Sequence, residues 1–349
     1  MRYVPIGELV KGSVLGQDIH NAVGARLMKK GMALEDGDIA FIAHMGIPGV
    51  YIDDAFSADI VAATQIAPEV ETHAKKMITS LFDAAQKDKA GTEEAELQAM
   101  VTEIVGNIME NPQVISNLVN IKTYDGYTYD HSVEVGILAG VLAARCRYDK
   151  RTVEYAVTAG LLHDIGKCDI SEDILNAPRR LNEEERAIMM QHPAMGYGIL
   201  KEKFNFPEEV NMAVLQHHEW YNGGGYPNHK TYAELLQISR LLKCADVFDA
   251  MTTKRPYHAP YLPSEVLEYI MGRSGMEFDP HIVQVMVSEI CVYPVGCEVI
   301  LSNGRHGIVK ENHRGFVLRP TLKMMDDGTE LNLLSDSSTR KITIVRVLM

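Results

Sequence analysis

Seven histidine and aspartate residues stand out in this chain because they lie in segments of otherwise apolar, helix-forming residues. They are His131, His163, Asp164, His192, His217, His218 and Asp246. Any one of them, taken alone, is most simply an ordinary core or surface residue. As a set they are different, since a polar side chain in apolar surroundings is costly unless it has a partner. We therefore expect them to share a ligand, and a metal ion suits these residue types.

Two adjacent pairs in this set, His163-Asp164 and His217-His218, lie at predicted helix ends. Neighbouring side chains on a helix point about 100° apart, so one carboxylate can bridge two ions while its neighbour binds one of them. Imidazole and carboxylate ligands without a thiolate favour Fe, Mn or Zn in a catalytic site over a structural zinc. The pattern predicts a two-metal centre.

A glycine-rich loop, His217–Pro227, follows the second pair with the sequence HHEWYNGGGYP. Three consecutive glycines allow unusual backbone angles and let the backbone approach a ligand closely. A flexible turn that ends a helix is the alternative explanation of these glycines. For Glu219, and for Asp249 further along, the sequence leaves open whether the carboxylate supports the site or only carries charge at a helix end.

The elements that must position these residues are predominantly helical. From residue 128 to 290 apolar residues recur at helical spacing, as in Val133, Ile137 and Val141. Asn182 with Glu185 is predicted to form a capping box. Residues 1–60 are predicted to form a small α/β regulatory unit and residues 61–120 a helical connector. Residues 291–349 are predicted to form a small β unit with strands at Glu298–Leu301, Gly307–Val309, Phe316–Arg319 and Lys341–Val347. The predicted fold class is mainly α, with an all-helical bundle at 121–290.

Composition and charge limit the classes of function. Apolar residues make up 46% and charged residues 23% of the chain, as in ordinary globular proteins. The formal charge of −13 disfavours binding to duplex nucleic acid or anionic lipid. No apolar run approaches the length of about 20 residues that a membrane helix needs, and the N-terminus lacks a secretory signal. The five cysteines are scattered and form no CxxC pair, which favours a reducing compartment. We expect a cytoplasmic protein without membrane insertion.

Five ordered segments carry a resemblance to a known family. The two clearest are Leu162–Lys167, with the sequence LHDIGK, and the glycine loop His217–Pro227. The others are Tyr129–Ser132, Gln191–Gly196 and Ala245–Thr252, the last followed by Arg255, Pro256 and Tyr257. Together they resemble the HD-GYP family of cyclic-dinucleotide phosphodiesterases, within the HD phosphohydrolase superfamily. The matching segments span fewer than half of the residues.

The resemblance implies a role for each matching residue. The seven histidines and aspartates match the family's metal ligands, with Asp164 bridging two divalent ions, Fe or Mn before other metals. Lys167 and Arg255 match its phosphate-binding residues, while Gly225, Tyr226 and Pro227 lie in the loop that shapes the substrate pocket. The implied activity is hydrolysis of cyclic di-GMP to pGpG, with GMP as a further product left open. The residues suit in-line attack by a metal-bridged hydroxide, with Asp164 and Lys167 as catalytic groups.

Three positions depart from the family's pattern. Asn222 stands where Asp is commoner, and Trp220 where an Arg often follows the Glu. An Asn side chain keeps a loop-stabilising hydrogen bond but carries no charge. Turnover would be altered if the Asp of the family pattern is more than structural. Some members hold a third metal through a Glu one turn before the first histidine. That position is Tyr127 here, so we expect two metals, with Asp125 or Asp130 as carboxylates that could recruit a third.

Other classes of function remain open at this point. A catalytically weak cyclic-dinucleotide receptor or scaffold would keep the same loop, and a hydrolase specific for cyclic GMP-AMP would share every motif. A nucleotide phosphohydrolase of the wider HD superfamily would explain His163-Asp164 but not the glycines. The sequence contains no Walker A motif and no GxSxG elbow. The expected partner is a cyclic dinucleotide, while a homodimer and contacts with a diguanylate cyclase or another signalling protein are left open.

Overall fold

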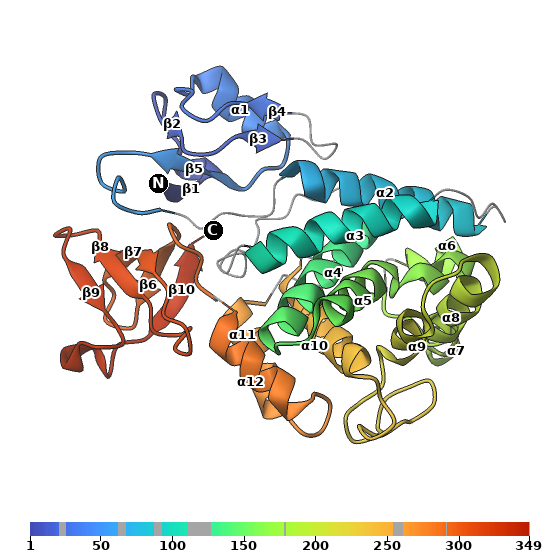
Figure 1. Ribbon diagram of the computed structural model, residues 1–349. Coiled ribbons are helices and arrows are strands. Elements are labelled where there is room, and N and C mark those ends of the chain that lie inside the picture. Colours follow the sequence, from blue (N-terminus) through green and yellow to red (C-terminus); the bar gives the residue numbers. More distant parts are fainter. Residues whose placement is uncertain are drawn as a thin grey trace.

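The computed structural model describes residues 1–20, 26–61, 68–86, 93–110, 127–177, 179–253, 261–290 and 292–348 (Figure 1). These residues form a large helical body, with a small N-terminal α/β unit and a five-stranded C-terminal sheet beside it. The predicted fold class, mainly α, is confirmed. The predicted boundaries at residues 60, 120 and 290 stay predictions.

Three mutually packed helices form the centre of the helical body: α4 (Tyr127–Arg145), α5 (Lys150–Leu162) and α10 (Gln237–Thr252). Their buried faces share one apolar core with the surrounding helices. Those helices are α2 (Pro68–Gln86), α3 (Glu93–Glu110), η3 (Ile165–Asp169), α8 (His192–Lys203), α9 (Glu208–Gln216), α11 (Pro263–Gly272) and α12 (Pro280–Glu289). The short helices α6 (Glu172–Leu175) and α7 (Glu183–Met189) have no buried residue and lie outside this core. In Figure 1 the pair α2 and α3 runs along one side of this body.

Glycines let α4 and α5 approach each other closely. A Cβ atom on Gly160 would lie 2.5 Å from the Cα atom of Gly136. A Cβ atom on Gly140 would lie 2.4 Å from a side-chain carbon of Val157. Since α4 carries His131 and α5 ends just before His163, this contact sets how near the two histidines come.

The start of α7 confirms the predicted capping box. The Asn182 side chain accepts a hydrogen bond from the Glu185 backbone N–H at 2.8 Å, and the Glu185 carboxylate accepts one from the Asn182 backbone N–H at 3.0 Å. These reciprocal bonds satisfy backbone donors that a helix start leaves unpaired. They help to place α7, whose last residue, Met189, contacts the site described below.

The N-terminal unit contains an antiparallel sheet with the strand order β1-β5-β2. Its strands are β1 (Arg2–Pro5), β5 (Gly49–Asp53) and β2 (Val14–Leu15), and a hairpin of β3 (Ile19–His20) and β4 (Arg26–Met28) lies alongside. The short η1 (Ile6–Glu8) and the helix α1 (Asp36–His44) complete the unit. Leu15, Leu34 and Ile42 are fully buried in a small core of its own.

The C-terminal sheet is antiparallel, with the strand order β10-β6-β7-β8-β9. The strands are β6 (Glu298–Leu301), β7 (His306–Glu311), β8 (Thr321–Met324), β9 (Glu330–Asn332) and β10 (Ile344–Leu348), with η4 (Ser337–Thr339) before the last. The strands predicted at 298–301 and 307–309 are confirmed, and the prediction at 341–347 overlaps β10.

The strand predicted at Phe316–Arg319 is wrong, because these residues form turns and the next strand starts at Thr321. Phe316 and Leu318 are exposed on either side of the buried Val317, which imitates the alternation of a strand. The Arg319 guanidinium donates to the backbone oxygens of Leu333, Thr339 and Ile342 and holds the turn in place.

The N-terminal region contacts the C-terminal sheet and the residues that lead into it. The Tyr3 backbone N–H donates to the Gly296 carbonyl at 2.9 Å, pairing the region of β1 with the entry to β6. Asp59 accepts hydrogen bonds from Lys310 of β7 and Lys323 of β8.

Among the helices in the described ranges, none has the length and apolar character to cross a membrane.

Candidate metal centre

The structure brings all seven predicted ligands together. His131 comes from α4 and Asp246 from α10, whereas the other five stand at helix ends. His163 and Asp164 lie between α5 and η3, His192 begins α8, and His217 and His218 follow α9. Six of the seven are buried, and His218 is partly exposed. Segments 115 residues apart in sequence therefore meet in one small polar cluster within the apolar core.

Three of the histidines are oriented by carbonyl groups of the helices that precede them. The Nδ1 atoms of His163, His192 and His217 lie 2.7, 2.8 and 2.6 Å from the carbonyl oxygens of the residues three positions earlier. These carbonyls stand in the last turns of α5, α7 and α9, where no helical N–H reaches them. Because a carbonyl only accepts, Nδ1 carries a proton in each ring, and Nε2 is then the ring atom that can bind a metal when the ring is neutral.

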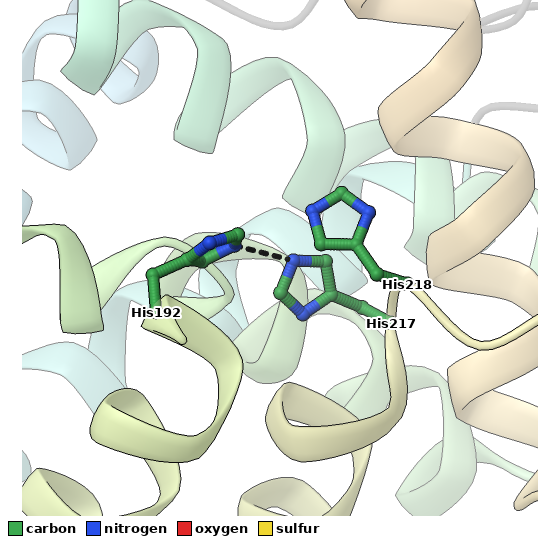
Figure 2. Close-up of side chains that lie close together, drawn as sticks. All are labelled: His192, His217 and His218. Carbon is green, nitrogen blue, oxygen red and sulfur yellow. Dashed lines mark hydrogen bonds between the residues drawn. The ribbon is translucent and has the colours of Figure 1, made fainter. Parts of the chain in front are cut away.

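Nε2 is the ring atom that remains for a ligand. Among the residues that the structure describes, His163 Nε2 is buried and has no hydrogen-bond partner. His192 Nε2 and His217 Nε2 lie 3.1 Å apart, the contact that Figure 2 marks with a dashed line between the two rings. Two lone pairs that face each other at this distance need a positive group between or beside them. The donor set therefore fits divalent metal ions, which bind neutral imidazole through this atom.

His131 is oriented by a carboxylate instead of a carbonyl. Its Nδ1 lies 2.7 Å from an Asp249 oxygen, and its Nε2 lies 3.2 Å from Asp246 and 3.8 Å from Asp164. Burial opposes charge on His131, but the hydrogen bonds with Asp246 and Asp249 outweigh it and raise the pKa to about 9. A carboxylate behind a histidine is the usual support of a metal-binding imidazole. Asp249 therefore contacts a candidate ligand directly and is more than a charge at a helix end.

The two buried aspartates lie between the histidines. Asp164 presents one oxygen 3.4 Å from His163 Nε2 and the other 3.4 Å from His192 Nε2. Two groups of three residues have ligand atoms within 4.8 Å of one another: His131, His163 and Asp164, and His192, His217 and His218. Asp164 therefore faces both groups, which is the position that a bridging carboxylate needs.

Unlike His131, three of the other histidines and Asp164 have protonation states that suit ligands of a cation. Burial lowers the pKa of His192 to about 4, and burial together with neighbouring histidines holds the pKa values of His217 and His218 well below their usual range. Burial alone would raise the pKa of Asp164, yet His163 and Lys167 hold it well below its usual value. Neutral imidazoles beside an ionised carboxylate are the forms that bind metals.

Lys167 stands at the open side of the cluster. Its ammonium lies 2.5 Å from Asp164, and its side chain is 24% exposed. The group is therefore in contact with a candidate bridging carboxylate and also accessible to a solute. Arg255, the second predicted phosphate-binding residue, lies outside the described residues.

The glycine loop is closed by polar contacts. The buried Glu219 carboxylate accepts from the backbone N–H groups of Asn228 at 2.6 Å and Lys230 at 3.1 Å, so it supports the loop. The Asn222 side-chain oxygen accepts from the Gly224 N–H at 3.0 Å. This is the loop-stabilising bond that we expected Asn to keep in place of Asp.

The loop residues Gly225, Tyr226 and Pro227 lie beside the histidines. A Cβ atom on Gly225 would lie 2.3 Å from the Trp220 backbone nitrogen, so the loop closes only with glycine there. The Tyr226 ring stacks on His218 with centroids 4.7 Å apart, and burial raises the pKa of its phenol. The Tyr226–Pro227 peptide bond is cis. The loop thus forms one wall next to the exposed edge of His218.

Of the three residues considered for a third metal, only the side chain of Asp130 is described. Asp130 pairs with Lys75 of α2 at 2.9 Å. Asp125 and the Tyr127 side chain lie outside the described residues.

The sequence analysis missed two charged residues next to the site. Lys243 is buried on α10, one turn before Asp246, and Glu277 is its ion-pair partner. Neither belongs to a motif or a recognisable spacing, so no sequence signal marks them.

Comparisons with known proteins match the region of the chain that holds these residues. A family described as HD domain matches residues 113–282. A cyclic di-GMP phosphodiesterase of Pseudomonas aeruginosa is 34% identical over 253 residues, which are 72% of this chain and 61% of that protein. A 3′3′-cGAMP-specific phosphodiesterase of Vibrio cholerae is 30% identical over 177 residues, which are 50% of this chain and 34% of that protein. The chain thus spans less than two thirds of these relatives.

A solved structure supports the fold. An HDG"Y"P protein of Bdellovibrio bacteriovorus has 17% sequence identity and a TM-score of 0.55, over 81% of this chain and 97% of that one. An HD domain is defined by three findings together: the helical bundle, the clustered histidines and aspartates, and the sequence matches. The chain belongs to the HD-GYP family, as its five ordered segments predicted.

Proposed function

We propose that this protein is a metal-dependent phosphodiesterase that hydrolyses cyclic di-GMP to pGpG, with GMP as a product of further turnover. The observation that carries the proposal is the set of buried Nε2 atoms without donors. His163 Nε2 has no hydrogen-bond partner within the described part of the chain, and the Nε2 atoms of His192 and His217 face each other at 3.1 Å. Such a cluster costs free energy unless a cation occupies it. The named activities of the relatives add the substrate class.

The chain would hold two divalent ions, and Fe or Mn suits the mixture of imidazole and carboxylate ligands. One group of ligands is His131, His163 and Asp164, the other is His192, His217 and His218, and Asp246 lies within 3.2 Å of His131 and 3.9 Å of His218. When bound, the ions would supply positive charge against the phosphoryl oxygens and make a water molecule acidic enough to attack at neutral pH.

The protein's own residues orient and neutralise the substrate. The Lys167 ammonium, partly exposed beside Asp164, would contact a non-bridging phosphate oxygen and offset the charge that develops there. Tyr226 and Pro227 would form the wall against which the dinucleotide packs, and Gly225 allows that wall to lie close to His218. Arg255 would be a further phosphate contact, by its position in the family motif.

A hydrolase specific for cyclic GMP-AMP is the second candidate, because the similar Vibrio cholerae protein is named for that substrate. The base-reading groups are what separate the two substrates, since the phosphates and the site chemistry are shared. A receptor that binds without turnover is less well supported, because Asn222 keeps its loop bond, six candidate ligands form two close groups, and Asp246 lies beside both groups.

The deciding experiment combines metal analysis with a product assay. Protein purified without oxygen and loaded with Fe or Mn is expected to contain two ions per chain and to convert cyclic di-GMP to pGpG. Cyclic GMP-AMP, offered alone and in competition, ranks the two substrates. The double variant His163→Ala/Asp164→Ala is expected to lose metal and turnover together. Binding of cyclic di-GMP without any linear product would instead support the receptor.

The cytoplasm is the proposed location. The cysteines Cys146, Cys168, Cys244 and Cys297 are free thiols, as expected in a reducing compartment.

A further inference from the structure

A buried ion pair lies beside the candidate metal centre. Lys243 is on α10, one turn before Asp246, and its ammonium lies 2.9 Å from a Glu277 oxygen. The two side chains are only 8% and 6% exposed. A buried ion pair adds little stability over an apolar pair of similar shape, because both charges lose their water. Stability alone therefore gives no reason for charges at these two positions.

Glu277 also belongs to the segment that holds the glycine loop. Its backbone carbonyl accepts from the Tyr221 N–H at 3.1 Å, and the carbonyl of Met276 accepts from the Asn222 N–H at 2.9 Å. The second Glu277 oxygen lies 3.3 Å from Arg273, whose guanidinium lies over the Trp220 ring at 6.0 Å. One side of this segment is thus hydrogen-bonded to the loop.

The other side of the same segment is fastened to α10. Besides Lys243 with Glu277, Arg240 forms an ion pair with Asp279, the N-terminal cap of α12. Lys243 and Arg240 are three residues apart and so lie on the same face of α10. The helix that carries Asp246 and the loop that carries His218 and Tyr226 are therefore connected through residues 276–279.

We propose that Lys243 and Glu277 are positioning residues that fix the glycine loop relative to α10. With the Glu277 side chain held by Lys243, its backbone carbonyl stays in place for Tyr221, and the loop keeps His218 opposite Asp246. The inference rests on the proposed function only where it expects a loss of turnover. Neither residue touches the reacting atoms, so both act through the loop.

Trp220 offers a direct readout, because it is the protein's one tryptophan and lies in the loop. The variant Lys243→Met/Glu277→Gln removes both charges and leaves no lone buried ion. We expect its Trp220 emission to move to longer wavelength, its quenching by acrylamide to increase, and kcat to fall by about tenfold through misplacement of the loop. The conservative variant Lys243→Arg/Glu277→Asp keeps both charges and is expected to retain wild-type emission and most of kcat.

Lys323→Met is the matched control. It removes a lysine of the C-terminal sheet that forms an ion pair with Asp59. It is expected to change neither Trp220 emission nor kcat. Wild-type emission and quenching in the Lys243→Met/Glu277→Gln variant would overturn the inference, as would a loss of kcat that only follows the loss of folded protein. If the wild-type protein hydrolyses no cyclic dinucleotide, the proposed function fails, while the fluorescence comparison still decides the role of the pair.

Discussion

At the scale of single residues, contacts within the protein orient four of the candidate ligands. His163, His192 and His217 each use a carbonyl three residues earlier in the sequence. His131 depends instead on Asp249, which lies 118 residues away in the sequence. Orientation by separate contacts means that each histidine can be weakened independently of the others.

Replacement of Asp249 by Asn tests the support behind His131. The amide can no longer accept as a charged carboxylate does, so the imidazole should be a weaker and less well-oriented ligand. We expect metal affinity to fall by about 10- to 100-fold, measured by competition with a chelator. Asp326→Asn is the control, because Asp326 pairs with Arg305 away from the site. Unchanged affinity in Asp249→Asn would contradict the assigned support.

Lys167→Ala tests the proposed phosphate contact. Loss of the ammonium should lower kcat by about 100-fold, as for other groups that stabilise developing charge. The metal content should stay at the wild-type value, because Lys167 is not a ligand. Lys201→Ala, at an exposed lysine that bonds Tyr197, is the control and should leave kcat unchanged. A lower metal content in Lys167→Ala would show that the lysine holds the centre together instead.

At the scale of elements, the distance between α4 and α5 governs the site. Gly136 and Gly160 allow the backbones to touch, and the helices carry His131 and lead to His163. Side chains at these positions would push the helices apart. The geometry of the centre is therefore set by two residues that carry no chemistry themselves.

Gly160→Ala makes this relation measurable. The added methyl group would meet the Gly136 backbone, so we expect the free energy of unfolding to fall by about 1–3 kcal/mol, with weaker metal binding. Gly198→Ala in α8 is the control, because a Cβ atom there has no neighbour within 4 Å. That variant should be as stable as the wild type or up to about 1 kcal/mol more stable. Urea unfolding and metal titration check both variants, and equal behaviour of the two would disprove the steric argument.

At the scale of the whole molecule, polar contacts join the N-terminal 60 residues to the C-terminal sheet. Asp59 lies 2.8 Å from Lys310 and 2.7 Å from Lys323, on neighbouring strands of the C-terminal sheet. The hydrogen bonds from Lys310 and Lys323 hold the pKa of the Asp59 carboxyl well below its usual range. The contact therefore depends on an ionised aspartate.

Asp59→Asn should make this contact insensitive to acid. Because the folded pKa is below the unfolded value of about 4, the wild-type contact stabilises the fold at neutral pH and is lost as pH falls through the folded pKa. We expect the melting temperature of Asp59→Asn to be lower than that of the wild type near pH 7. The difference should shrink as the pH drops below about 4. Melting curves across this range decide it, and a constant difference at every pH would contradict the ionic origin.

Much of the site was determined by the sequence alone. The ligand types, the glycine loop and the capping box of α7 are local patterns, and local patterns reflect contacts within a few residues. The false strand at Phe316–Arg319 shows the limit of such patterns. Its alternation resembles a strand, but Arg319 bonds to carbonyls 14 to 23 residues away and holds a turn.

Only the tertiary structure decided which groups face each other. It placed Asp249 behind His131, put the two oxygens of Asp164 toward different histidines, and paired Lys243 with Glu277. These contacts join residues that are distant in sequence, and a carboxylate at a helix end looks the same whether it meets solvent or an imidazole. The physical reason is that the charge, burial and orientation of such a group depend on neighbours that only packing brings to it.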